Sequence, residues 1–296
     1  MMTKSGNRFL SDNHATKNFM DCADVSAKCQ RNPVALASEA NPAMTRKLDL
    51  SGCWNDVMQL FRTHRELLLS VAGVFILLPG LAFAMFVPPP QSPPDADLTT
   101  IYANMQSFYQ GNFGWIILIG LLNGFATIVM LVLMLDPSRP SVSEAMRRAF
   151  SIILPYYAMG VLSGVLTFLG SLAFILPGIY IFVKLIVAGP VMVAERAHTI
   201  IAPMRRSWAL TKNNSGRILI FLLVVAVTAF FVYITSVTVF GIVIRLALDG
   251  EIAGTLVTLV DAVISMLLTV LMVCVYAGIY RKLAGPGPED IAREFS

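Results

Sequence analysis

Charged residues are scarce in this sequence and unevenly placed. Of its 296 residues, 56% are hydrophobic and 14% are charged, whereas soluble domains have about 25% charged residues. Sixteen of the 40 charged residues fall within positions 1–66, so the rest of the chain contains long stretches with almost none. This composition excludes a soluble globular enzyme for most of the chain, and it also excludes a disordered protein. It predicts a multi-span membrane protein.

Residues typical of catalytic and metal sites are also few. No histidine lies beside paired carboxylates or at a metal-ligand spacing, and no cysteine spacing suits zinc or a redox pair. The patterns G-x-S-x-G, Walker A and H-E-x-x-H do not occur. We therefore expect no enzyme activity, no catalytic residue, no metal and no cofactor, and the modest net charge of +4 argues against nucleic acid as a partner. The residues concerned are His14, His64, His198, Cys22, Cys29, Cys53 and Cys274.

The apolar residues fall into runs long enough to cross a bilayer. A hydrocarbon core of about 30 Å needs about 20 residues at a rise of 1.5 Å each. The stretch 152–194 is too long for one helix, and Leu176-Pro177-Gly178 is the expected break within it. The runs lack the alternation of barrel strands, so the predicted fold class is all-α and polytopic, with six transmembrane helices. The expected spans are 67–86, 113–135, 152–176, 178–194, 218–246 and 253–280.

The scarce lysines and arginines indicate an orientation. They gather in the segments 136–151 and 195–217, whereas 87–112, 176–178 and 247–252 contain none. Short loops rich in Lys and Arg stay in the cytoplasm. The alternation holds through all six spans, and it predicts a multi-pass protein of the bacterial inner membrane with both termini cytoplasmic.

Three regions are expected along the chain. Residues 1–45 are polar, without a periodic apolar face or a signal-like apolar run, and are predicted to be disordered. Met44-Thr-Arg-Lys is similar to a bacterial start, which leaves open whether 1–43 is an annotation extension. Residues 46–285 form the predicted six-span membrane domain, and 286–296 form a short cytoplasmic tail.

A short motif occurs twice at a spacing of 58 residues. Met146 to Phe150 and Met204 to Trp208 both read Met-Arg-Arg-small-aromatic, and a looser version runs from Trp54 to Arg65. These repeats predict three weakly related units, each an interfacial helix followed by two spans. Ser141-x-x-Glu144 predicts a capping box at the start of the middle interfacial helix.

The paired arginines of this motif have two interpretations. The first is that they only set the membrane topology. The second is that they contact anionic lipid headgroups, because arginines held at headgroup depth bind lipid phosphates. The candidate lipid-contact residues are Arg147, Arg148, Arg205 and Arg206.

Two charged residues lie deep within the expected spans. Lys184 lies about 9 Å below the outer end of the fourth span, and Asp261 lies about 12 Å below that of the sixth. A charge inside the membrane is costly. The two residues are a candidate intramembrane polar pair, as part of an ion or proton path or as a lock between two helices. Alternatively, Lys184 reaches the headgroups on its long side chain.

Small residues also suggest where helices pack. Gly120-x3-Gly124 and Gly160-x3-Gly164 permit close approach between helices. Asn123, beside Gly124, is expected to hydrogen-bond between helices. These spacings are weak evidence for packing, because a chain with 20 glycines contains several of them by chance.

A family resemblance rests on a distinctive succession of residues. It runs through Leu176-Pro-Gly-Ile-Tyr-Ile, Lys184-Leu, Gly189-Pro-Val, Glu195 and Arg206-Ser-Trp-Ala-Leu-Thr-Lys. This succession resembles YciC-like bacterial inner-membrane proteins and is similar to the membrane domain of glycerophosphoryl diester phosphodiesterases. The resemblance covers roughly residues 48–285, and Lys184 departs from the arginine common in the family. It implies an integral membrane protein for which no catalytic residues are established.

These observations favour a structural or interaction role in the cell envelope. The expected partners are membrane lipids, with anionic-lipid contact, and other envelope proteins. The alternative is a transporter or small permease that uses the Lys184/Asp261 region, since transporters often contain helices interrupted by Pro or Gly. A membrane-embedded lipid enzyme would need paired histidines or carboxylates facing a headgroup, and the sequence has none.

Overall fold

The computed structural model describes residues 49–87, 90, 93, 96–136, 138 and 140–285. The predicted disordered segment 1–45 and tail 286–296 lie outside the described residues. Within the described part all regular elements are helical, and six stretches are long and apolar enough to cross a membrane. The predicted all-α polytopic fold is therefore confirmed. The six stretches are Leu50–Phe86, Phe113–Leu135, Val142–Ala173, Ile175–Ala194, Ser215–Ala247 and Ile252–Ala284.

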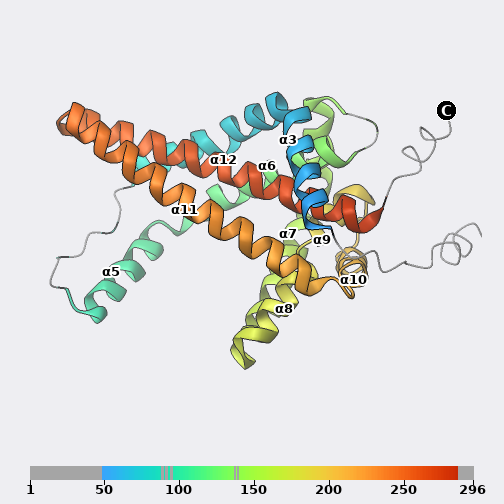
Figure 1. Ribbon diagram of the computed structural model, residues 1–296. Coiled ribbons are helices and arrows are strands. Elements are labelled where there is room, and N and C mark those ends of the chain that lie inside the picture. Colours follow the sequence, from blue (N-terminus) through green and yellow to red (C-terminus); the bar gives the residue numbers. More distant parts are fainter. Residues whose placement is uncertain are drawn as a thin grey trace, which may run out of the picture. The chain divides into compact units, whose positions relative to one another are not determined.

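The first half of the chain contains the first three of these stretches and one shorter helix, α5, which connects the first stretch to the second and stands apart from the others (Figure 1). Asp49 caps α3, accepting a hydrogen bond from the Ser51 backbone N–H at 3.2 Å. Asp97 likewise caps α5, accepting one from Thr100 N–H at 2.8 Å, and this bond lowers the pKa of its carboxyl. The elements are α3 (Leu50–Ala72), η1 (Gly73–Leu77), α4 (Leu78–Phe86), α5 (Leu98–Gly111), α6 (Phe113–Leu135) and α7 (Val142–Ala173).

The second half of the chain contains the remaining helices. α8 and α9 together make up the fourth candidate span, and α10 is a short helix before the last two spans. α11 and α12 run side by side as a long antiparallel pair (Figure 1). The elements are α8 (Ile175–Leu185), α9 (Ala188–Ala194), α10 (Ile201–Leu210), α11 (Ser215–Ala247) and α12 (Gly250–Ala284).

The expected interfacial helices differ from one another. α3 and α7 each continue into their span without interruption, and only α10 is a separate helix. α10 ends at Leu210, and beyond it Asn213 adopts a left-handed backbone with φ of 66°. Asparagine tolerates this conformation better than most residues, so the chain turns here before α11 begins. The three-unit repeat of the sequence stays a prediction, because its interfacial segments do not share one structure.

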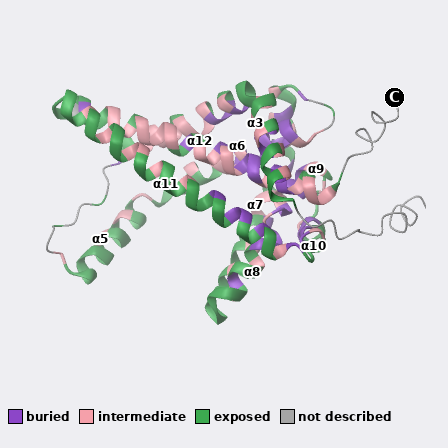
Figure 2. Ribbon diagram, viewed as in Figure 1, coloured by how far each residue is buried: buried purple, intermediate pink, exposed green. Residues whose placement is uncertain are grey.

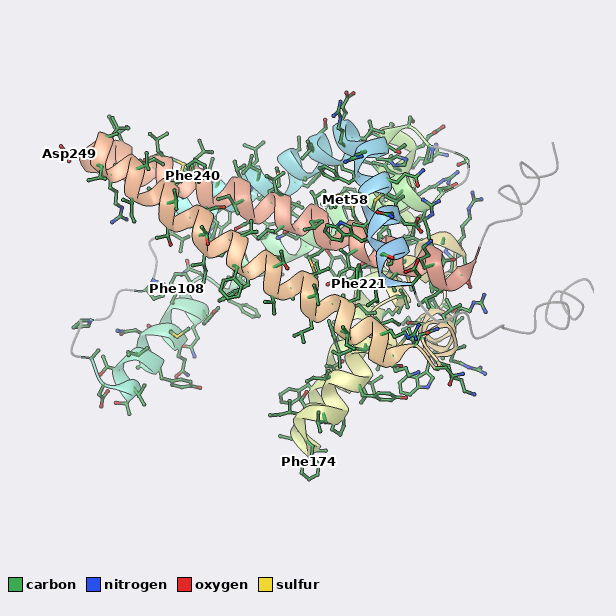
Figure 3. All side chains as sticks on the ribbon, in the orientation of Figure 1. Met58, Phe108, Phe174, Phe221, Phe240 and Asp249 are labelled. Carbon is green, nitrogen blue, oxygen red and sulfur yellow. The ribbon has the colours of Figure 1, made fainter. Side chains whose placement is uncertain are left out.

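The reversal between the third and fourth spans lies earlier than expected. The predicted turn at Leu176-Pro177-Gly178 is wrong, since α7 ends at Ala173 and Phe174 alone separates it from α8. Phe174 lies at the tip of the α7–α8 hairpin (Figure 3). Pro177 belongs to the first turn of α8, where a helix has no partner for a backbone N–H and proline is tolerated. Gly178 serves close packing, because its Cα lies against Gly170 and Ser171 of α7.

The hydrophobic core lies where α3, α6 and α12 pack together. Figure 2 shows buried residues gathered near this meeting of helices. Val57, Val129, Val270 and Cys274 are fully buried in it. At Gly278 of α12 a Cβ would lie 2.6 Å from the Val57 side chain, so glycine allows α3 to approach. The many exposed apolar residues on the outer faces of the helices suit contact with lipid.

The predicted small-residue packing holds at one of its four glycines. Gly124 lies against the ring of Tyr157, whose hydroxyl donates to the backbone carbonyl of Leu121. A Cβ at Gly120, Gly160 or Gly164 would meet nothing within 4 Å. The expected hydrogen bond of Asn123 is not formed through its amide oxygen, which is buried and has no partner among the described residues.

Candidate functional site

The buried polar residues are concentrated in one part of the fold. Among the described residues, four polar or charged residues are buried as a whole: Lys184, Ser207, Thr211 and Asn214 are each no more than 7% exposed. Lys184 lies on α8, Ser207 on α10, and the other two in the turn that leads to α11. We call Lys184, Ser207 and Thr211 the polar junction. Polar groups that are shielded from water need hydrogen-bond partners within the protein. The residues of the polar junction provide such partners for one another.

The polar junction lies where the fourth span is interrupted. α8 ends at Leu185 and α9 begins only at Ala188, so carbonyls of the last turn of α8 lack helical partners. The Ser207 hydroxyl donates to the Lys184 carbonyl at 2.7 Å, and the Thr211 hydroxyl lies 3.5 Å from the same oxygen. The Ser207 hydroxyl thereby satisfies the carbonyl freed by the break and holds α10 against α8, while the Thr211 hydroxyl donates to the Ser207 backbone carbonyl at 2.8 Å.

The ammonium group of Lys184 lies beside two aromatic rings. Its Nζ atom is 5.4 Å from the centre of the Tyr180 ring and 5.6 Å from that of Trp208. The two rings meet edge to face, with centres 6.0 Å apart. A cation within about 6 Å of an aromatic face is attracted by the ring quadrupole, and more strongly where water is excluded. The rings thus compensate in part for burying this charge.

Asp261 has a different partner. The Tyr233 hydroxyl of α11 donates to its carboxylate at 2.7 Å. Among the described residues no ion pair joins Lys184 to Asp261. The structure therefore does not bring the two deep charges together, and each is held by aromatic residues.

Because Lys184 and Asp261 have separate partners, we expect them to contribute independently to the free energy of unfolding. We expect the destabilisations caused by Lys184→Met and Asp261→Asn to add within about 0.5 kcal/mol in the double variant. The free energy of unfolding, measured in mixed micelles for the four proteins of the cycle, checks this. A coupling above about 1 kcal/mol would instead show that the two residues form the intramembrane pair.

The arginines expected at headgroup level fall into two kinds. Arg148 forms an ion pair with Asp136, and Arg206 pairs with Glu195 at 3.0 Å. Asp136 and Glu195 each lie just after the preceding span, at the C-caps of α6 and α9. Arg196 also reaches Asp136, at 3.3 Å. The Arg148 pair links the end of α6 to the start of α7, and the Arg206 pair links the end of α9 to α10.

Arg147 and Arg205 remain without such partners. Both are exposed, and neither forms an ion pair with any other described residue. The capping box is confirmed: Glu144 accepts from the Ser141 backbone N–H at 2.9 Å, and the Ser141 hydroxyl accepts from Glu144 N–H at 3.4 Å. It sets where α7 begins, so Arg147 lies in the second turn of that helix. The two free arginines are thus presented on ordered helices.

The residues that sequence reasoning missed are mainly Ser207, Thr211 and Asp136. Ser207 and Thr211 belong to the segment that carries the family resemblance, but nothing in their spacing indicated a buried contact. In the sequence, Asp136 is only the first residue after the expected span 113–135. Because it directly follows an apolar run and precedes three arginines by fewer than 15 residues, its pairing with one of them was a detectable signal. No group of three potential metal ligands occurs in the described ranges.

The fold and these contacts define a polytopic α-helical membrane protein with a discontinuous fourth span. Residues 150–283, from Phe150 in α7 to Leu283 in α12, match the family described as the membrane domain of glycerophosphoryl diester phosphodiesterase. The predicted similarity to that domain is therefore confirmed over this part of the chain, whereas the YciC-like resemblance stays a prediction. No curated protein and no solved structure matches the chain significantly.

Proposed function

We propose that this integral membrane protein has a structural or interaction role in the envelope, without enzyme activity, and contacts anionic phospholipid headgroups. One observation carries the proposal: Arg147 and Arg205 are exposed and have no ion-pair partner among the described residues, while their neighbours Arg148 and Arg206 are held by carboxylates. Other envelope proteins are the further partners in this role. The proposed location is the bacterial inner membrane, with both termini cytoplasmic, on the basis of the Lys and Arg distribution.

The chemistry of arginine supports this role. Its planar guanidinium donates two parallel hydrogen bonds to a phosphate, which adds geometry to the electrostatic attraction. Anionic lipids of the cytoplasmic leaflet attract each basic residue near the surface by about 1 kcal/mol. The ion pairs of Arg148 and Arg206 neutralise those two side chains and leave the adjacent guanidinium groups available to lipid.

Replacing both exposed arginines tests the proposal. We expect Arg147→Gln with Arg205→Gln to reduce the excess of retained phosphatidylglycerol over phosphatidylcholine about tenfold or more, because two attractions of about 1 kcal/mol are lost. Native mass spectrometry of the full chain, released from micelles containing phosphatidylglycerol and phosphatidylcholine in equal amounts, measures the ratio of the two bound lipids.

Arg245→Gln is the matched control, since Arg245 is exposed at the opposite end of α11 and also has no ion-pair partner among the described residues. It should leave the lipid ratio unchanged. A double variant that retains as much phosphatidylglycerol as the unmodified chain would refute the proposed contact.

The interrupted fourth span favours a second candidate, a transporter that uses the Lys184/Asp261 region. Transporters often bind substrates where a span is broken and its backbone carbonyls are freed. Against this, the freed Lys184 carbonyl is engaged by Ser207, and Asp261 by Tyr233. Proton or solute flux into vesicles reconstituted with the full chain would favour transport over the lipid-contact role.

A further inference from the structure

An apolar groove lies between the first turns of α3 and the α11–α12 pair. Its volume is about 410 Å³, and nine of its eleven lining residues are apolar. Leu50 and Trp54 line it from α3, Phe221 to Val232 from α11, and Leu268 and Leu271 from α12. Figure 3 labels Phe221, which marks one end of the groove on α11. Arg147 and Arg205 lie on other helices, so the groove is a separate feature.

The groove has the depth of a single leaflet. From Phe221 to Val232 the lining follows eleven residues of α11, or about 16 Å at 1.5 Å per residue. Half of a hydrocarbon core of about 30 Å is about 15 Å. Trp54, whose side chain is 40% exposed, stands near the start of α3 at the end expected to meet the headgroups. The groove therefore extends from headgroup level to the bilayer centre.

The length of the groove distinguishes a lipid chain from a protein helix that crosses the membrane. Such a helix would need a wall along both leaflets, about 30 Å, whereas the groove follows only about 16 Å of α11. A single hydrocarbon chain is narrower, and the bilayer supplies one directly.

Polar residues mark the end of the groove that is expected at headgroup level. Lys282 lies there with its Nζ atom 3.3 Å from the Asp56 carboxylate, and Asp49 caps α3 nearby. Because Lys282 is paired with Asp56, binding in the groove depends on its apolar lining and not on the charge of the headgroup. We propose that the groove binds one acyl chain of a phospholipid from the leaflet that faces the start of α3.

Filling the groove tests the inference. Ala229 lines the groove on α11, and Ala226 lies on the same helix, exposed and outside the lining. In native mass spectrometry of the full chain after delipidation in detergent, the unmodified protein should retain one phospholipid. Ala229→Phe should reduce this occupancy at least fivefold, and Ala226→Phe should not change it. Equal retention by Ala229→Phe and Ala226→Phe overturns the inference.

Fluorescence of Trp54 provides a second measurement, which does not depend on the Ala229→Phe variant. Phospholipid brominated on its acyl chains should quench the emission component that is absent from Trp54→Phe, and quenching should saturate near one lipid per protein. Quenching that rises without saturation shows only mixing in the micelle and overturns the inference. Co-purification of a protein helix in place of the lipid would also overturn the inference.

Lipid retention distinguishes the loss of the groove contact from the loss of the arginine contact. Loss at the groove lowers the number of retained phospholipids whatever their headgroup charge, whereas loss at Arg147 and Arg205 lowers only the preference for phosphatidylglycerol. A chain with the groove intact and the arginines replaced should therefore still retain one phospholipid.

Discussion

Replacing Asp136 by alanine is expected to lower the free energy of unfolding by about 2 kcal/mol, because charged hydrogen-bonded groups lose their partner. The Asp136 side chain is 6% exposed and is paired with both Arg148 and Arg196. Its removal leaves the guanidinium groups of Arg148 and Arg196 without this shared carboxylate. It also releases Arg196, whose left-handed backbone at φ of 50° is rare for a residue with a side chain. Urea or SDS titration in mixed micelles measures the change.

Glu195→Ala is the matched control for this prediction. Glu195 and Arg206 form the corresponding pair, but their side chains are 40% and 51% exposed. Solvent-exposed ion pairs contribute about 0–1 kcal/mol. If Asp136→Ala proves no more destabilising than Glu195→Ala, the buried carboxylate does not tie α6 to α7 and to the turn before α10.

The second large effect is expected from Gly178→Ala. A Cβ at this position would lie 2.8 Å from the Cα of Ser171 in α7, a backbone atom that cannot rotate away. The α7–α8 hairpin would have to open at its narrowest point, and such overpacking costs about 1–3 kcal/mol. We expect unfolding to become easier by about 2 kcal/mol in the same micelle titration.

Gly164→Ala separates packing from helix propensity. Gly164 also lies on α7, but a Cβ there would meet nothing within 4 Å. Alanine is the better helix former, by about 1 kcal/mol over glycine in water, so this variant should be neutral or more stable. Similar losses for both variants would mean that the close approach at Gly178 does not limit the packing of the hairpin.

The number and type of membrane elements could be predicted because they depend on local composition. A run such as Phe113–Leu135 has the length of a bilayer and almost no polar side chains, so helix formation within it depends on no distant residue. The Ser141–Glu144 capping box is equally local, since both hydrogen bonds join residues three apart. The similarity to a known membrane domain likewise rests on successive residues.

The candidate site could be predicted only in part. The arginines were expected at headgroup level from their positions in the chain, but which of them are free depends on where Asp136 and Glu195 meet them. Lys184 was expected to need a partner, and depth alone suggested Asp261. Depth along a helix does not determine rotation about its axis, and the rotation of α8 faces Lys184 and Tyr180, its neighbour on the same helix face, towards Trp208 of α10.

The scarcity of charge in this sequence by itself determined that the protein is a bundle of apolar helices, because unpaired polar backbone and side chains are too costly in hydrocarbon. Only the tertiary structure decided where that bundle is irregular. The reversal at Phe174 leaves Gly178 free to pack against Ser171, and the break after Leu185 is accommodated by Ser207, which satisfies the freed carbonyl of Lys184. These choices depend on contacts between residues distant in the chain, which no local pattern specifies.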